Sequence, residues 1–142
     1  MVSRPHLSEQ PEPLPHEGVQ VRLGVSGIHG IGVFAEEPIG AGTNVFATDT
    51  RDITWVTSSL LTDGSLENFQ RRFYEDFAIR SGDELGCPAN FALLTAGWYV
   101  NEPYAGEEPN LIATADFDLV ASRDIAPGEE LTILYSALNR AR

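Results

Sequence analysis

The 142-residue chain has no lysine, only one cysteine and no long apolar run, and each absence excludes something. Cys87 has no cysteine partner, so an intramolecular disulfide and a zinc site built from several thiolates are both excluded. No apolar run approaches the roughly 20 residues that span a bilayer, and the Pro- and Glu-rich amino end lacks the order of a secretory signal. We therefore expect a cytoplasmic protein without a bound metal, held together by packing.

Basic residues are scarce: nine arginines against 21 acidic residues give a formal charge of −12. Phosphate backbones are bound chiefly by Lys and Arg, so this charge disfavours direct binding of DNA or RNA. An acidic surface attracts basic proteins, and it equally serves solubility, so both interpretations stay open.

Proline and glycine divide the chain into a tail and one domain. Residues 1–17 are rich in proline and polar side chains and cannot bury enough apolar surface to offset ordering, so we expect a disordered tail. Residues 18–142 suit a single domain. Short apolar and β-branched runs between turn residues predict strands over 19–23, 32–35, 44–48, 117–122 and 130–134.

One segment has helical periodicity instead. Apolar residues recur at helical spacing over 65–80, and Gly82 follows as a stop signal. The stripe is formed by Leu66, Phe69, Phe73 and Phe77, and such a stripe usually packs into a core. The sequence therefore predicts a mostly β protein with one inserted amphipathic helix.

Two ten-residue segments repeat one pattern. Residues 33–42 and 119–128 share alanine, isoleucine and glycine at the same offsets, and each predicts strand, turn, strand. In the second copy Pro127 presets the φ of a turn and Gly128 can take a positive φ. Two copies are too few for a solenoid, so we expect two related β units packed together.

Three segments carry patterns beyond scaffold. The first contains Gly30-Ile31-Gly32 after His29, and paired glycines let a ligand approach the backbone closely. The second contains Asn101-Glu102-Pro103, with Pro109-Asn110 following. The third, 121–135, runs through a turn and a Glu-Leu strand to Tyr135. Taken singly, the first segment is typical of a tight turn and the second of other turns. The third is typical of a tyrosine ring packed at the end of a strand.

Taken together and in this order, the three segments resemble the SET-domain family of protein-lysine methyltransferases. The resemblance covers about residues 18–136 and is to a small, prokaryotic-type member, because cysteine-rich flanks are absent. It implies the SET-domain β-clip architecture of short strands, with a threaded C-terminal segment. It also implies S-adenosylmethionine as cofactor and lysine side chains of a protein as methyl acceptors.

The resemblance assigns roles to individual residues. Tyr135 matches the catalytic tyrosine, and Tyr99 and Tyr104 are candidates for lining the lysine channel, since aromatic faces suit an alkylammonium. Cofactor contacts fall on His29, Gly30, Ile31, Gly32, Asn101 and Glu102. This chain departs from the family pattern, which has histidine, serine, aspartate and an aromatic residue, at Glu102, Pro103, Leu134 and Ala137. The number of methyl groups transferred therefore stays open.

The implied chemistry needs a neutral amine, whereas a free lysine has a pKa near 10.4. A narrow, poorly solvated channel would lower that pKa, and Tyr135 would position the amine. Because the chain has no lysine, its substrate must be a separate protein, and a basic one would suit the acidic charge. In larger family members a C-terminal flank helps to close the channel, so here residues 138–142 or a second subunit of a homodimer would have to close it.

Two other interpretations stay open. Glu102, Leu134 and Ala137 are compatible with a degenerate SET domain that acts as a non-catalytic binding module. The duplicated unit also occurs in β-clip proteins that bind carbohydrate or ice, although the segments around Asn101 and Tyr135 argue against that alternative.

Overall fold

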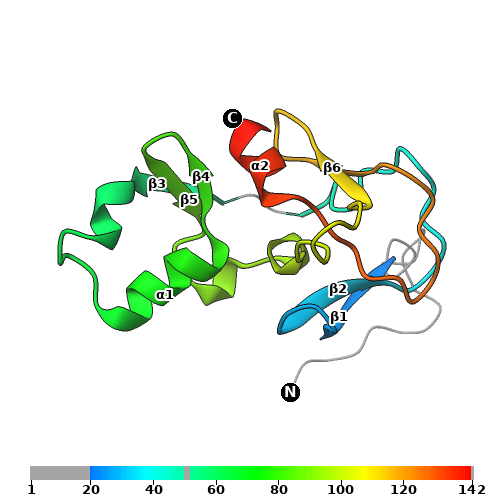
Figure 1. Cartoon of the computed structure of the whole chain (residues 1–142), viewed down its shortest axis with the longest axis horizontal. Helices are drawn as coiled ribbons and strands as arrows, with labels where there is room; N and C mark the ends of the chain where they lie inside the picture. The colour runs from blue at the N-terminus through cyan, green and yellow to red at the C-terminus, as the bar shows by residue number, and fades with distance from the viewer. Residues whose placement is uncertain (1–19, 50–51, 142) are drawn as a thin grey trace, which may run out of the picture.

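The computed structural model describes residues 20–49 and 52–141. In this part of the chain, seven strands of three to five residues form three small antiparallel sheets, as Figure 1 shows in part. The sheets are β1 (Val21–Val25) with β2 (Ile31–Ala35), then β3 (Thr54–Thr57), β5 (Glu84–Cys87) and β4 (Ile79–Ser81) in that order, and β6 (Leu111–Ala113) with β7 (Leu119–Ala121). The predicted mostly β class is confirmed, whereas the predicted tail over 1–17 lies outside the described residues.

Helices are few and short. The described residues contain α1 (Asn68–Phe77) and α2 (Tyr135–Ala141), together with the 3-10 turns η2 (Ser58–Leu61), η3 (Phe91–Leu93) and η4 (Ala96–Tyr99). Figure 1 shows α1 and the β3–β5 sheet at one end of the molecule, and the β1–β2 hairpin and β6 in its other half.

The inserted helix α1 is shorter than the predicted 65–80. It begins after Glu67, which forms a capping box with Gln70. It ends at Phe77 because the next residues form β4, and Gly82, with a φ of 59°, turns the chain into β5. Gly82 is therefore a hairpin residue and not a helix stop.

The aromatic stripe of α1 is only partly packed. The rings of Phe73 and Phe91 are 4.9 Å apart, and those of Phe77 and Tyr99 are 5.6 Å apart. Phe69, in contrast, is 66% exposed, so the prediction that the whole stripe packs is wrong at this residue.

Two predicted strands are irregular. Residues 44–48 form turns, with only Asn44 bridged to Val120, so the predicted strand there is wrong. Residues 130–134 form isolated bridges, because they exchange partners along their length: Leu131 pairs with Val33 of β2, and Ile133 donates to the carbonyl of Asn101. Residues 130–134 therefore lie between β2 and the segment that contains Asn101.

The two repeated segments pack against each other. The backbones of Ile39 and Ile125 exchange hydrogen bonds of 2.9 and 2.8 Å, and both side chains are 1% exposed. Gly42 and Gly128 occupy equivalent turns, with φ of 88° and 84°. The prediction of two related β units is confirmed, and these units supply much of the core that supports the segment leading to Tyr135.

Candidate active site

The loop between β1 and β2 presents its backbone at the surface. Ser26 closes the loop, since its N–H donates to the carbonyl of Gly30 at 2.8 Å and its hydroxyl accepts from the N–H of Ile28 at 2.9 Å. Gly30 has a φ of 47° and open space where a Cβ would lie. The Tyr104 hydroxyl donates to the carbonyl of Gly27 on the same loop.

Asn101 connects this loop to Glu130 through hydrogen bonds of its side chain. Its side-chain nitrogen is 2.9 Å from the carbonyl oxygen of His29, 3.2 Å from that of Ile31 and 3.0 Å from Oε2 of Glu130. An amide nitrogen carries two hydrogens, so three acceptors converge on two donors. The structure thus brings the Gly-x-Gly segment and Asn101 together. The three acceptors exceed by one the two hydrogens that the Asn101 amide can donate.

Glu130 completes this cluster and is not among the residues predicted from sequence. The Ser26 hydroxyl lies 2.8 Å from both carboxylate oxygens of Glu130. A Cβ at Gly32 would overlap the Glu130 carboxylate, so any larger residue there would displace this carboxylate. In the sequence, Glu129 and Glu130 predict a turn followed by a strand. That pattern does not predict the contact of Glu130 with Ser26.

Asn110 holds residues 130–132 through side-chain hydrogen bonds. Its side chain is buried; Oδ1 accepts from the N–H of Thr132 at 2.8 Å, and Nδ2 donates to the carbonyl of Glu130 at 2.9 Å. Asn101 and Thr132 pair as a parallel bridge beside it. Both asparagines of the second motif therefore act on residues 130–133.

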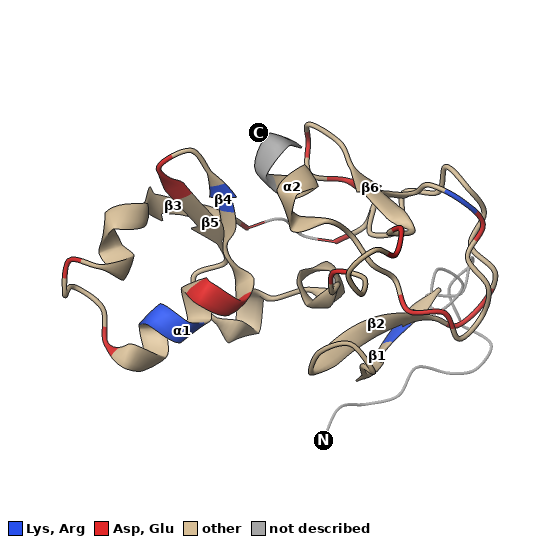
Figure 2. Ribbon diagram, in the orientation of Figure 1, with Lys and Arg blue, Asp and Glu red and all other residues tan. Residues whose placement is uncertain are grey.

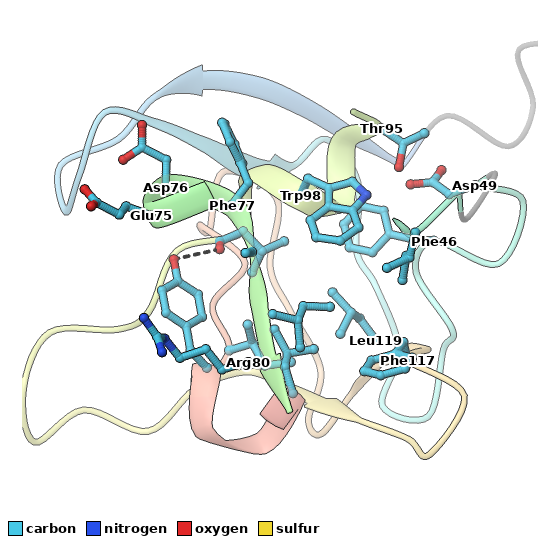
Figure 3. Close-up of a pocket in the computed structure, with 18 residues that line it drawn as sticks. Phe46, Asp49, Glu75, Asp76, Phe77, Arg80, Thr95, Trp98, Phe117 and Leu119 are labelled. Atoms are coloured by element: carbon cyan, nitrogen blue, oxygen red, sulfur yellow. Dashed lines mark hydrogen bonds between the residues drawn. The ribbon is translucent and has the colours of Figure 1, made fainter. Parts of the chain in front are cut away.

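Tyr135 is the first residue of α2. Its backbone N–H donates to Oε1 of Glu102 at 2.8 Å, and its hydroxyl donates to the carbonyl of Val100 at 3.2 Å, the dashed line in Figure 3. Burial raises the pKa of the Tyr135 hydroxyl, and the negative charge of Glu102 raises it further. The hydroxyl is therefore protonated at neutral pH and acts as a donor, not as a base.

A cavity of about 290 Å³ opens beside Tyr135. Aromatic, aliphatic and acidic side chains line it, and Figure 3 shows Phe77, Trp98 and Phe46 around it. The lining residues used below are Phe46, Asp49, Glu75, Asp76, Phe77, Arg80, Thr95, Gly97, Trp98, Val100 and Tyr135. No sequence pattern indicates Asp49, and the helical stripe predicts that Phe77 packs into the core.

The two tyrosines predicted to line a channel do not line this cavity. Tyr99 packs against Phe77 behind the cavity wall, and Tyr104 contacts the β1–β2 loop through its hydroxyl. Glu102, predicted as a cofactor contact, directs its carboxylate to Tyr135.

The described residues contain neither a metal-ligand cluster nor a helix of membrane-spanning character. Within residues 20–49 and 52–141, no group of three or more His, Cys, Asp or Glu side chains is arranged to share a metal ion. Over those ranges, no helix combines the length and hydropathy of a membrane span.

The three motif segments thus meet around Asn101, Glu130 and Tyr135. The family model named SET domain matches residues 30–136. The chain belongs to the SET-domain family. The comparison with curated proteins gives no match.

The fold is also similar to that of a solved methyltransferase domain. The methyltransferase domain of human PR domain-containing protein 2 has a TM-score of 0.51 at 23% identity, covering 94% of this chain and 89% of that one. A Plasmodium falciparum protein described as a candidate histone methyltransferase has a TM-score of 0.49 at 16% identity, covering 80% and 90%. The predicted SET β-clip architecture is confirmed at the level of fold.

Proposed function

We propose that this SET domain transfers methyl groups from S-adenosylmethionine to lysine side chains of a protein substrate. The observation that supports the proposal is the position of two consecutive residues. Val100 lines the cavity and accepts the hydrogen bond of Tyr135, while Asn101 holds the Gly-x-Gly loop. A substrate cavity and a cofactor loop on either side of one short segment are what methyl transfer between two ligands requires.

The loop fits the amino-acid end of the cofactor. Its acceptors are the carbonyls of His29 and Ile31 and the Glu130 carboxylate, which outnumber the hydrogens that Asn101 offers, so they suit an ammonium group. Gly30 leaves space for close approach. When bound, S-adenosylmethionine supplies an electrophilic methyl group on a sulfonium sulfur. His29, Gly30, Ile31, Gly32 and Asn101 are the residues that would hold it, with Glu102 acting through Tyr135.

The cavity suits the lysine. Where aliphatic side chains line it, desolvation disfavours the charged ammonium form and lowers the pKa of an amine that enters, whereas the carboxylates of Asp49, Glu75 and Asp76 favour the charged form, so the neutral nucleophile is expected in the aliphatic part of the cavity. Tyr135, protonated and fixed at both its backbone and its hydroxyl, orients that amine and removes no proton from it. In this proposal Tyr135, Val100 and Phe77 form the channel wall, with Tyr99 behind it.

The substrate is a separate protein, because the chain contains no lysine. Figure 2 shows acidic residues on several elements, including the last turn of α1, where Glu75 and Asp76 line the cavity. A basic, lysine-bearing segment is therefore the expected partner. A cytoplasmic location and a homodimer stay predictions, and elution as a monomer from a sizing column would count against the dimer.

The first experiment is calorimetric titration of S-adenosylhomocysteine into the full chain, because it needs no substrate. We expect binding in the micromolar range, with adenosine as the weaker control ligand. Labelled methyl donor is then offered to lysine-rich basic proteins and to the same proteins with acetylated lysines, which should accept no label. Absence of cofactor binding would contradict the proposal. Binding without transfer to any lysine-rich protein would favour the non-catalytic module.

A further inference from the structure

Asp49 brings a buried charged atom to the cavity wall. It follows the turns after Phe46, and its N–H donates to the carbonyl of Phe46 at 3.0 Å. Its Oδ2 atom is buried, yet none of the described residues donates a hydrogen bond to it. Buried polar atoms are nearly always hydrogen-bonded, so a donor at this position would come from the cavity side.

The surroundings of this oxygen suit a cation. A Cβ built on Gly97 would be 3.4 Å from the Phe46 ring and 3.7 Å from Oδ2 of Asp49, so glycine leaves the space beside this oxygen unfilled. Figure 3 shows Asp49 beside Thr95 and Trp98. Phe46, Asp49, Thr95, Gly97 and Trp98, all lining residues, form what we name the Asp49 corner. A guanidinium pairs with a carboxylate through two hydrogen bonds and stacks on aromatic faces.

The reacting lysine is the wrong occupant for this corner. A carboxylate next to an amine favours its charged form, which opposes methyl transfer. Tyr135, which would orient that lysine, donates to the carbonyl of Val100 and not to the buried oxygen of Asp49. A side chain that stays charged while bound is the better match, and arginine is charged at every physiological pH.

The inference rests on the proposed function. We propose that the Asp49 corner binds an arginine side chain of the substrate, close in sequence to the target lysine, and that Asp49 makes the enzyme selective for such sequences. Charge supports this occupant, because three carboxylates and one guanidinium, that of Arg80, line the cavity. Alternate side chains of an extended peptide lie on one face, roughly 6.5 to 7 Å apart, so one segment can present both residues.

The binding test uses Nα-acetyl-arginine methylamide as the probe and the indole N–H signal of Trp98 in an NMR titration as the readout. The chain has two tryptophans, and Trp55→Phe assigns the two signals. We expect a saturable shift of the Trp98 signal and an affinity at least tenfold weaker in Asp49→Asn. Asp52→Asn, at an exposed residue outside the cavity lining, is the matched control and should bind as the wild type.

The neutral citrulline analogue separates charge from shape and should cause no saturable shift. Equal affinity in Asp49→Asn, or an equal response to citrulline, would overturn the proposal. A single-lysine peptide carrying arginine should exceed its citrulline counterpart in kcat/KM by about tenfold or more, and Asp49→Asn should bring the ratio close to one. Cofactor binding without any arginine response would refute this inference alone, whereas an arginine response without cofactor binding would refute the proposed function.

Discussion

Oε1 of Glu102 accepts a 2.8 Å hydrogen bond from the backbone N–H of Tyr135. The first N–H groups of a helix have no partner inside it, and a carboxylate near them is favourable. Glu102 is one of the positions at which this chain departs from the family pattern, which has a histidine there. The departure is therefore compatible with a positioned Tyr135, because the new side chain fixes the start of α2.

Replacing Glu102 should impair turnover more than folding. Glu102→Ala removes the acceptor, so the start of α2 loosens; we expect about 0.5 to 1 kcal/mol less stability in urea and a kcat at least tenfold lower. Glu102→Gln keeps a side-chain oxygen and should stay close to the wild type. Glu107→Ala, at an exposed residue, is the control. Equal kcat values for the Ala and Gln variants would show that Glu102 does not position Tyr135.

Tyr135→Phe should abolish turnover while S-adenosylhomocysteine affinity stays within about twofold, because only the hydroxyl that orients the amine is lost. The pKa of this hydroxyl is raised, so it stays protonated below its ordinary value near 10. No loss of rate from Tyr135 deprotonation is therefore expected below about pH 10 in the wild type. Tyr74→Phe, on α1 outside the cavity lining, is the matched control, and retained turnover in Tyr135→Phe would refute the role.

Gly32→Ala should weaken cofactor binding through Glu130. The added Cβ overlaps the Glu130 carboxylate, which must then leave Ser26 and Asn101. We expect about 1 to 3 kcal/mol of lost stability and at least tenfold weaker S-adenosylhomocysteine binding by calorimetry. In the double variant Gly32→Ala/Glu130→Ala, the losses of stability from the two substitutions should be less than additive, since both remove the contacts of the Glu130 carboxylate. Full additivity would contradict the coupling.

Sequence predicts those parts of the site that lie in contiguous motifs. The Gly-x-Gly loop, Asn101 and Tyr135 each have such a motif, and the repeat predicts two related units packed together. Asp49 could not be predicted, because it lies just after residues 44–48, where a strand was expected and turns form instead: the Val45 N–H donates to the carbonyl of Leu119, and no continuous ladder follows.

The same limit applies to the contacts of single side chains. Tyr135 was expected to end a strand and begins a helix, since residues 130–134 exchange partners instead of forming one ladder. The contacts of Glu102 and Glu130 join segments about 30 to 100 residues apart, so no local pattern encodes them.

The two turns of the repeat should respond alike to substitution. Gly42 and Gly128 both have φ near 85°, and no atom lies within 4 Å of a Cβ built on either. Alanine at each therefore costs backbone strain alone, which we expect to be about 1 kcal/mol in urea unfolding. Gly40→Ala, whose φ is not positive and whose Cβ would meet only the Thr43 hydroxyl at 4.0 Å, should be nearly neutral. A large difference between the two turns would contradict their equivalence.

The ion pair that closes the second repeat predicts an acid-sensitive contribution to stability. Nη2 of Arg123 is 2.7 Å from Oε2 of Glu129, whose Oε1 also accepts from the N–H of Ala126 at 3.0 Å. The Arg123 hydrogen bond is the largest cause that lowers the pKa of Glu129. A lowered folded pKa means that the native state binds this proton less readily than the unfolded chain, whose value is about 4.3.

The contribution of Glu129 is therefore present above about pH 4.3 and is lost as the pH falls through the lower, folded pKa. Because both side chains are partly exposed, we expect Glu129→Gln to lower the free energy of unfolding at pH 7 by only about 0.5 to 1 kcal/mol. The difference from the wild type should shrink steadily toward pH 3 in urea titrations, while Glu107→Gln shows little difference at either pH. A difference that stays constant down to pH 3 would mean that packing, and not the charge of Glu129, carries its effect.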